Sequence, residues 1–402
     1  MNIKEIKKGK LIKGDCLNKL KKIPSNCIDL MITDPPYGLS YYGLDWDKKV
    51  PNPEVWKECL RVLKPGGFAF VMSSARQDVL SRMILNLGDA GFNMKFTSLY
   101  WTFTTGFPHA NKIGTAIDKK LGVKSKIVET RTQERVKFKL ARDLGGKENF
   151  CDGSRIEYNI IEPSSQLGKE LKGGYSGFQP RPAVEAILVA MKPLGKKSYV
   201  DQAISNSKGV TFLDDCKIPY FDKKNQLQKR FMSNLIVTDN ALDRFESGPC
   251  NEIKYLDKEG NSYRFSLDTW AKYTLPHLFV AKPSRYEKDF GLESLPAGNI
   301  VNRKLGQKSF NVPMKSRPSD RKNVHPSVKP LKLMAYLTVL GSRQGDLVLD
   351  PFCGSGTTCV ASMLLGRKFI GIEKDKTCDR TIIKERHSIT GRITLTSKTF
   401  IM

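Results

Sequence analysis

The stretch that most constrains this chain is a short apolar run that ends in a carboxylate and two prolines. The run Ile28–Thr33 is apolar or β-branched at five of its six positions, and Asp34-Pro35-Pro36-Tyr37 follows it directly. Such a run predicts a buried β-strand that stops at a sharp turn. Because ligands of open α/β sheets gather where the loops leave the strands, we expect Asp34 to lie at a ligand-binding edge.

The residue types in this turn indicate which ligand it suits. Proline fixes φ and removes backbone donors, so the carbonyls of Asp34 and Pro35 are held rigidly and can act as acceptors. Tyr37 adds a flat aromatic face. A carboxylate, a rigid carbonyl and a ring together suit a planar base that has an exocyclic amino group. Taken alone, the same residues are also typical of an ordinary proline turn after a strand.

A second strand and loop occur near the other end of the chain. Leu347–Asp350 predicts a buried strand, and it leads through a glycine-containing loop into a helix from about Thr357 to Leu365. Glycines let the backbone approach a small ligand, and the positive N-terminus of the helix favours a carboxylate. A Walker loop would end in Gly-Lys-Ser/Thr, whereas Gly356 is followed by two threonines, so nucleotide hydrolysis is not indicated.

Two further acids are predicted at the same edge. The run Lys368–Glu373 predicts a strand that ends in an acid about 23 residues after Asp350, near the spacing at which nucleotide-binding sheets place a carboxylate on ribose. This favours Glu373 as a ribose ligand, with a surface glutamate at the end of a strand as the alternative. Residues 10–15 predict a strand that ends at Asp15, which also places that carboxylate on the edge.

Together, Asp34–Tyr37 and Leu347–Thr358 resemble the catalytic and cofactor motifs of the amino-methylating DNA methyltransferases, which use S-adenosylmethionine. The order, catalytic motif first and cofactor loop last, resembles the beta class of that family. The resemblance covers about residues 10–110, 180–195 and 325–388. It implies an α/β fold with a Rossmann-like, doubly wound, seven-stranded methyltransferase sheet, a circularly permuted motif order, and an inserted loop-rich DNA target-recognition region.

The resemblance also implies roles for individual residues. The catalytic tetrapeptide corresponds to Asp34, Pro35, Pro36 and Tyr37. An acid and its neighbour after the first strand meet the cofactor's adenine, and the segment His325–Pro330 contributes to the methionine end of the pocket. The predicted contacts of S-adenosylmethionine are therefore Asp15, Cys16, His325, Ser327, Lys329, Asp350, Pro351, Phe352, Gly354, Ser355, Gly356, Thr357 and Glu373.

The charge balance favours a polyanionic partner. The net charge is +26, from 67 Lys and Arg against 41 Asp and Glu. Such a surplus favours phosphate contacts and counterion release, although a generally lysine-rich composition would give the same sum. Between Arg303 and Lys329 there are eight basic residues and one acid. We predict that Arg317, Arg321 and Lys322 contact double-stranded DNA, the alternative being a mobile solvated loop.

The predicted organisation has five parts. They are a catalytic half (1–110), a basic insertion (111–180), a core sheet strand (181–193), a target-recognition region (194–324) and a cofactor-binding half (325–402). If residues 181–193 form the last strand of the sheet, residues 105–180 are an excursion between two neighbouring strands.

Other bulk features favour a cytoplasmic protein that associates with the nucleoid through DNA. No stretch approaches the ~18 apolar residues of a membrane span, and the N-terminus has no signal core. The nine cysteines form no CxxC pair, so we expect reduced thiols and no metal site. A homodimer and a cognate restriction endonuclease are suggested only by analogy with the class.

The residue types suit the exocyclic amine of adenine or cytosine, and the resemblance implies adenine N6 in double-stranded DNA, with the target base flipped out of the helix. Asp34 and the Pro35 carbonyl accept both amino hydrogens, so the nitrogen lone pair faces the sulfonium methyl, and Tyr37 stacks on the base. In the family, the aspartate form of the motif is more often seen with adenine, and cytosine N4 is the alternative. An inactive DNA-binding homologue is disfavoured by the intact motifs, and RNA or protein methylation by the motif order.

The glycine and aromatic loop Gly38–Asp47 directly follows Asp34–Tyr37, the predicted catalytic turn. Its aromatic side chains, Tyr41, Tyr42 and Trp46, could close over a flipped base or line the DNA path. A surface loop with one aromatic anchor is the alternative.

Overall fold

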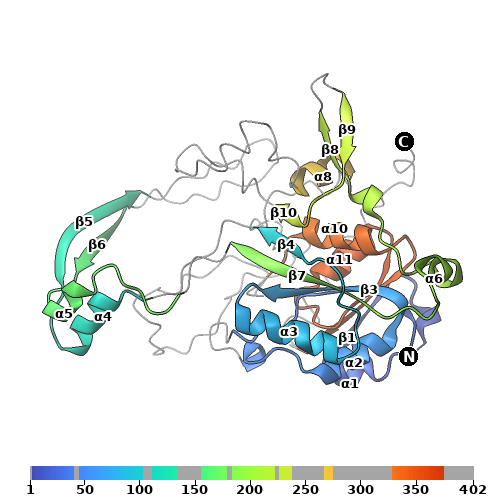
Figure 1. The fold of residues 1–402 in the computed structure, drawn as a ribbon, viewed down its shortest axis with the longest axis horizontal. Helices are drawn as coiled ribbons and strands as arrows, with labels where there is room; N and C mark the ends of the chain where they lie inside the picture. Colours follow the sequence, from blue (N-terminus) through green and yellow to red (C-terminus); the bar gives the residue numbers. More distant parts are fainter. Residues whose placement is uncertain are drawn as a thin grey trace. The chain divides into compact units, whose positions relative to one another are not determined.

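The computed structural model describes residues 2–39, 45–102, 111–134, 155–178, 183–221, 226–237, 267–274 and 328–374. The chain divides into two compact units, Met1–Thr104 with Ala183–Met402, and Thr105–Pro182. The first unit contains an eight-stranded sheet with helices on both faces (Figure 1). All the predicted site residues that the structure describes lie in this unit.

The sheet has the order β1-β12-β11-β2-β3-β7-β4-β10. The first five strands in this order pair in parallel, and so do β4 and β10 at the other end. β7 is antiparallel to both of its neighbours. The bounds are β1 (Gly9–Lys13), β2 (Ile28–Thr33), β3 (Leu63–Ser74), β4 (Leu99–Thr102), β7 (Val184–Met191), β10 (Leu235–Val237), β11 (Leu347–Asp350) and β12 (Lys368–Glu373).

Alternating side chains of the central strands build two hydrophobic cores. In β2, Leu30 and Ile32 pack into one core, whereas Met31 packs into the other. This alternation follows from the two-residue period of a strand, and it leaves all six residues of β2 buried. The helices that cover one face are α1 (Cys16–Leu20), α2 (Pro53–Val62) and α3 (Gln77–Asp89), and those on the other are α10 (Leu331–Gly341) and α11 (Thr357–Leu364) (Figure 1).

The predicted doubly wound α/β fold is confirmed, and the part of the sheet that the structure describes has one strand more than the seven expected. The additional strand is β10, three residues long, which pairs with β4 at the edge of the sheet. Three residues are too few to show a period, so no pattern in the sequence marked it. Residues 194–324 also form α6 (Tyr199–Asn206), η5 (Leu213–Cys216), β8 (Ile218–Phe221), β9 (Leu227–Arg230) and α8 (Leu267–Thr274).

A buried carboxylate joins the two ends of the chain at the start of β2. Asp29 Oδ1 lies 2.6 Å from Lys64 Nζ and 2.9 Å from Lys208 Nζ, and its Oδ2 accepts the backbone N–H of Leu347 at 2.9 Å. Lys208 also pairs with Asp346 at 2.9 Å. Burial opposes ionisation of Asp29, but the two lysines outweigh it and lower its pKa. The ion pairs therefore fix β2 against β11 at the edge opposite to their carboxyl ends.

The described residues of the second unit form an antiparallel hairpin and two helices. A buried carboxylate, Asp118, accepts hydrogen bonds from the hydroxyls of Ser125 and Ser165 and from the backbone N–H groups of Ser164 and Ser165. The flanking strands β4 and β7 pair in the sheet of the first unit. The elements of the unit are α4 (Ile113–Lys120), β5 (Lys126–Glu134), β6 (Arg155–Glu162) and α5 (Gln166–Glu170).

Gly341 allows α10 to pack closely on the central strands. A Cβ at this position would lie 2.6 Å from Leu30 Cδ1 and 2.8 Å from Phe70 Cε2. We expect Gly341→Val to lower the free energy of unfolding by about 1–3 kcal/mol, as overpacking does, measured by denaturant unfolding. Gly88→Val, in the exposed part of α3 with no neighbour within 4 Å, is the matched control and should change stability by less than ~0.5 kcal/mol. Equal effects at the two glycines would contradict this packing.

Two kinds of feature are absent from the described residues. No helix among them combines the length and the apolar character that crossing a membrane requires. Within the same residues, no three His, Cys, Asp or Glu side chains are grouped so that they could hold a metal ion.

Candidate active site

The sheet topology brings acids from both ends of the chain to one edge. Asp15 follows β1, Asp34 follows β2, Asp350 ends β11 and Glu373 ends β12, and these four strands are parallel neighbours. β7 runs in the opposite direction, so its first residues, including Glu185, begin at this same edge. The catalytic turn and the glycine loop, more than 300 residues apart in the chain, therefore leave adjacent strands.

Asp34, Tyr37, Glu185 and Lys329 form a cluster of four side chains. The Tyr37 hydroxyl donates to Asp34 Oδ1 at 2.7 Å, and Lys329 Nζ donates to Asp34 Oδ2 at 2.7 Å. The same hydroxyl lies 3.0 Å from Glu185 Oε2, and the same ammonium lies 3.3 Å from that oxygen. Two carboxylates thus share two donors that come from different parts of the chain.

Burial and the neighbouring charges set the protonation of this cluster. Burial lowers the pKa of Lys329, but the charges of Asp34 and Glu185 outweigh it and hold the pKa above its ordinary value. Burial, followed by the same two carboxylates, raises the pKa of Tyr37. Burial also raises the pKa of Glu185, against the opposing charge of Lys329. Lys329 is therefore a cation and Tyr37 a neutral hydroxyl, and both can act as donors.

A buried aspartate shapes the catalytic turn. Asp47 Oδ1 accepts the backbone N–H of Tyr37 at 2.7 Å and that of Gly38 at 3.0 Å, and Gly38 has a φ of 75°. Asp47 belongs to the loop that the sequence associates with the flipped base. Of that loop's aromatic residues, Trp46 is described and 45% exposed, whereas Tyr41 and Tyr42 lie outside the described residues.

The glycine loop is held against the end of β12. Gly354 and Gly356 have φ values of 49° and 80°, in the left-handed region that favours glycine. The N–H of Gly354 donates to Glu373 Oε2 at 2.8 Å, and Gly356 precedes α11 as its N-cap. Ser355 and Thr357 are buried. An open backbone, a helix N-terminus and a carboxylate fit the carboxylate and ribose of S-adenosylmethionine.

The remaining predicted cofactor residues flank this loop. Asp15 caps α1 by accepting the N–H of Asn18 at 3.1 Å. Burial, with Asp15 as the next cause, raises the pKa of Cys16 to about 12, so this thiol is not an activated nucleophile. Pro351 is buried, and the Phe352 ring lies 6.1 Å from that of Trp56.

Some predicted residues are not described. His325, Ser327, Arg317, Arg321 and Lys322 lie outside the described residues, and their assignments stay predictions. The resemblance assigns Lys329 to the methionine end of the cofactor pocket, whereas its ammonium donates to the Asp34 carboxylate.

Sequence reasoning missed Glu185 and Asp47. The signal for Glu185 was a lone acid at the start of an otherwise apolar strand, Val184–Met191. Only the antiparallel direction of that strand places the acid at the site. For Asp47 we find no signal, because acids in glycine-rich loops are common.

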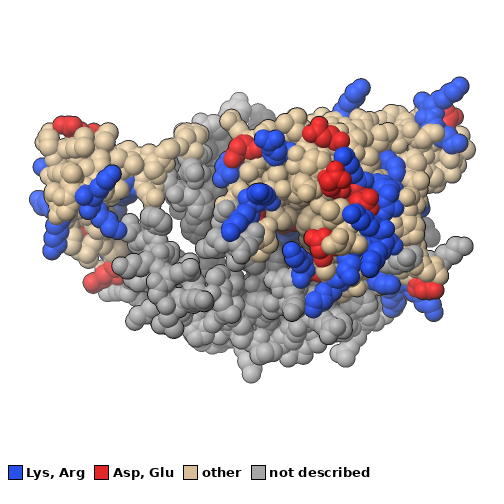
Figure 2. All heavy atoms as spheres, turned by 90° about the horizontal axis from the view of Figure 1, so that it is seen from below, with Lys and Arg blue, Asp and Glu red and all other residues tan. Residues whose placement is uncertain are grey.

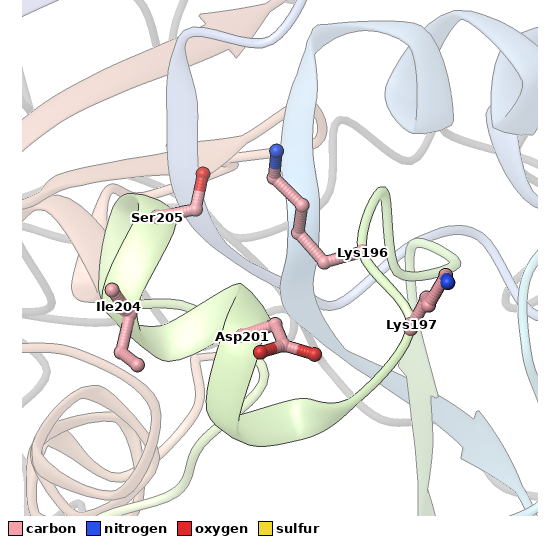
Figure 3. Close-up of a pocket in the computed structure, with 5 residues that line it drawn as sticks. All are labelled: Lys196, Lys197, Asp201, Ile204 and Ser205. Carbon is pink, nitrogen blue, oxygen red and sulfur yellow. The ribbon is translucent and has the colours of Figure 1, made fainter.

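A separate surface hollow lies beside α6 (Figure 3). It is lined by Lys196, Lys197, Asp201, Ile204 and Ser205. α6 follows the end of β7, where Met191 pairs with Phe68, and that end lies opposite the edge with the catalytic turn. This hollow contains none of the predicted site residues.

The buried Asp350 predicts a pH-dependent stability. Burial raises its pKa to about 7, although its Oδ1 accepts the Thr33 hydroxyl at 2.7 Å and the Phe352 N–H at 3.1 Å. Since the folded pKa exceeds the unfolded value of ~3.9, this contribution to stability is complete below about pH 4 and is lost as the pH rises through about 7.

Asp350→Asn removes the charge and keeps an Oδ1 acceptor. We expect the variant to exceed the wild type in free energy of unfolding by on the order of 2 kcal/mol at pH 8, with the difference vanishing near pH 4. Denaturant unfolding at both pH values measures this, and the exposed Asp78→Asn is the control. No gain at pH 8 would mean that Asp350 is not a buried, poorly solvated charge.

Comparison with known proteins gives a family match over most of the chain. A model of the N6/N4 family, described as DNA methylase, matches residues 28–385. The type II methyltransferase M2.MboI of Moraxella bovis is 30% identical over 130 residues, which is 29% of this chain and 48% of that protein. M2.DpnII of Streptococcus pneumoniae is 48% identical over 52 residues, 13% of this chain and 19% of that protein. The matched parts span less than half of either relative.

Solved structures that match this chain include the PvuII DNA methyltransferase, described as cytosine-N4-specific. It is 15% identical, with a TM-score of 0.42 over 96% of this chain and 92% of that one.

Proposed function

This chain belongs to the N6/N4 family of DNA methylases, and on that premise we propose that it methylates the exocyclic N6 amino group of adenine in double-stranded DNA. The family uses S-adenosylmethionine, which supplies the methyl group when bound. Cytosine N4 is the alternative target atom. The proposal rests on the placement of one carboxylate beside one glycine loop.

The observation that best supports this proposal is the contact between the carboxyl ends of β2 and β11. The two strands pair in parallel, and the Thr33 hydroxyl at the end of β2 donates to Asp350 at the end of β11. The catalytic turn and the glycine loop are thereby fixed to each other within one rigid part of the sheet. A base amino group bound to Asp34 and a methyl donor bound to the glycine loop would therefore lie next to each other. Catalysis by proximity requires that the two reacting groups are held close together.

Asp34 keeps the capacity to accept the target amino group. A carboxylate offers about four acceptor positions, and Tyr37 and Lys329 occupy two of them. The Pro35 carbonyl accepts no hydrogen bond from any residue that the structure describes. An exocyclic amine is a poor nucleophile because its lone pair is delocalised into the ring. Acceptance of both its hydrogens by Asp34 and Pro35 would favour a pyramidal nitrogen whose lone pair forms the bond to the methyl group. The bond between that methyl group and sulfur would break, S-adenosylhomocysteine would leave, and one amino proton would pass to water.

Tyr37 is the proposed stacking partner of a flipped base. Its hydroxyl is anchored on Asp34 and Glu185, so the orientation of its ring is fixed. Lys329 Nζ lies over the ring at 5.4 Å from its centroid. We therefore place the base on the opposite face of the ring, where stacking would add about 1–3 kcal/mol.

The surface charge supports DNA as the polyanion. Figure 2 shows Lys and Arg gathered on the face of the first unit that carries the N-terminal segment and α1. The N-terminal segment and the residues that follow α1 contain the exposed lysines Lys7, Lys8, Lys10, Lys21 and Lys22. The proposed contacts by Arg317, Arg321 and Lys322 fall outside the described residues. A homodimer and a partner endonuclease are proposed by analogy with the class and with type II relatives.

Transfer of label from tritiated S-adenosylmethionine tests the proposal. The purified chain is incubated with mixed-sequence duplex DNA, single-stranded DNA, RNA and a protein mixture in separate reactions. We expect acid-precipitable label in duplex DNA, falling steeply as salt increases. Label confined to RNA or protein would contradict the proposed substrate.

A further inference from the structure

Glu185 is a charged side chain of the site to which no motif assigned a role. It is the second residue of β7, opposite Ser74 at the end of β3 and Trp101 in β4. Strands on both sides therefore fix its backbone. Its side chain is 19% exposed, close to the 18% of Asp34. A second carboxylate here raises the cost of burying Asp34 unless a cation is shared between them.

The two carboxylates compete for the same two donors. A tyrosine hydroxyl has one proton, so it donates to Asp34 or to Glu185 at any moment. The Lys329 ammonium has three protons, and it lies 2.7 Å from Asp34 and 3.3 Å from Glu185. Without Glu185, both donors would bond to Asp34 alone and would neutralise more of its charge.

The balance of charge in the cluster also depends on Glu185. When both carboxylates are ionised, they and the single cation Lys329 leave an excess of one negative charge beside the glycine loop. Such an excess stabilises the positive charge that develops on an amino nitrogen as it takes up a methyl group. Loss of Glu185 would leave Asp34 and Lys329 as a neutral pair.

Resting on the proposed function, we propose that Glu185 is a positioning residue for methyl transfer. It draws the Tyr37 hydroxyl and the Lys329 ammonium partly away from Asp34, so that Asp34 can accept the amino group of the base. Glu185 itself touches Asp34's two donors and not the base.

Glu185→Gln tests this role because it keeps the size and one acceptor oxygen but removes the charge. We expect kcat to fall about 10- to 100-fold, while the KM for DNA and the Kd for S-adenosylmethionine stay within ~3-fold of wild type. Glu54→Gln, which removes a 63% exposed carboxylate from α2, is the control and should leave kcat unchanged. The melting temperature and 13Cζ chemical shifts of labelled tyrosines show that each variant is folded.

A double-mutant cycle separates positioning from a purely structural role. Tyr37→Phe removes the shared hydroxyl and keeps the ring. If Glu185 acts through that hydroxyl and the cation, the double variant Tyr37→Phe/Glu185→Gln should be no more than ~3-fold slower than the slower single variant. Fully additive losses would overturn the inference.

Activity of the wild type separates a failure of the Glu185 role from a failure of the proposed function. A wild type that methylates DNA, together with a Glu185→Gln variant of unchanged kcat, overturns the role of Glu185 and leaves the proposed function intact. A wild type that methylates no DNA overturns both.

Discussion

Replacement of Asp34 by alanine is expected to lower kcat for DNA methylation by about 10³-fold, the upper range for loss of one preorganised electrostatic group. The variant loses the acceptor of the target amino group and the partner of both Tyr37 and Lys329. Binding of S-adenosylmethionine and of DNA should stay within ~3-fold of wild type, because the glycine loop and the basic surface are untouched. Single-turnover kinetics with a duplex substrate measure the loss.

Two controls make this result specific. Asp34→Asn keeps the shape and one acceptor oxygen, so it should retain more activity than alanine while remaining well below wild type. Asp78→Ala removes a 65% exposed acid and should have no effect. The melting temperature of Asp34→Ala, compared with that of the wild type, shows whether the variant stays folded when Lys329 pairs with Glu185 only. An Asp34→Ala variant with more than a tenth of the wild-type kcat would place the chemistry elsewhere.

Replacement of Glu373 by alanine should weaken binding of S-adenosylmethionine by about 10- to 100-fold, the range for loss of a charged hydrogen-bonding group. Two effects add. The proposed ribose ligand is lost, and the N–H of Gly354 loses its acceptor, so the glycine loop is no longer held. Isothermal titration of the free protein with S-adenosylmethionine measures the Kd directly and requires no DNA.

Glu373→Gln separates the two effects. Its amide oxygen can still accept the Gly354 N–H, so the loop stays in place and the Kd should fall between those of wild type and alanine. The exposed Glu54→Ala is the control for loss of a negative charge. A Kd for Glu373→Ala within 3-fold of wild type would mean that the cofactor does not use the end of β12.

The sequence predicted most of the central sheet because local pattern and burial agree there. The run Ile28–Thr33 is apolar or β-branched at five of its six positions, the sheet buries all six, and the strand ends one residue before the two prolines. Leu347–Asp350 and Lys368–Glu373 match their predicted bounds for the same reason. Parallel pairing then places Asp15, Asp34 and Glu373 at one edge without further information.

The sequence could not predict the place of residues whose position depends on tertiary structure. Glu185 reaches the site only because β7 runs antiparallel, and direction has no local signature. Lys329 was assigned to the cofactor through a family segment, and its bond to Asp34 depends on where the start of α10 packs. β10 was missed because three residues show no period. Strand positions could be predicted because they follow the local sequence pattern. Strand direction and pairing could not, because they depend on how the whole chain packs.

Identification of the methylated nucleoside tests the central claim most directly. Duplex DNA that has been incubated with the chain and S-adenosylmethionine is digested to nucleosides and analysed by mass spectrometry, with Asp34→Ala as the parallel reaction. We predict N6-methyladenine in the wild-type reaction and none above background in the variant. N4-methylcytosine would keep the site and mechanism but reverse the base, whereas no methylated nucleoside from a chain that binds the cofactor would contradict the account.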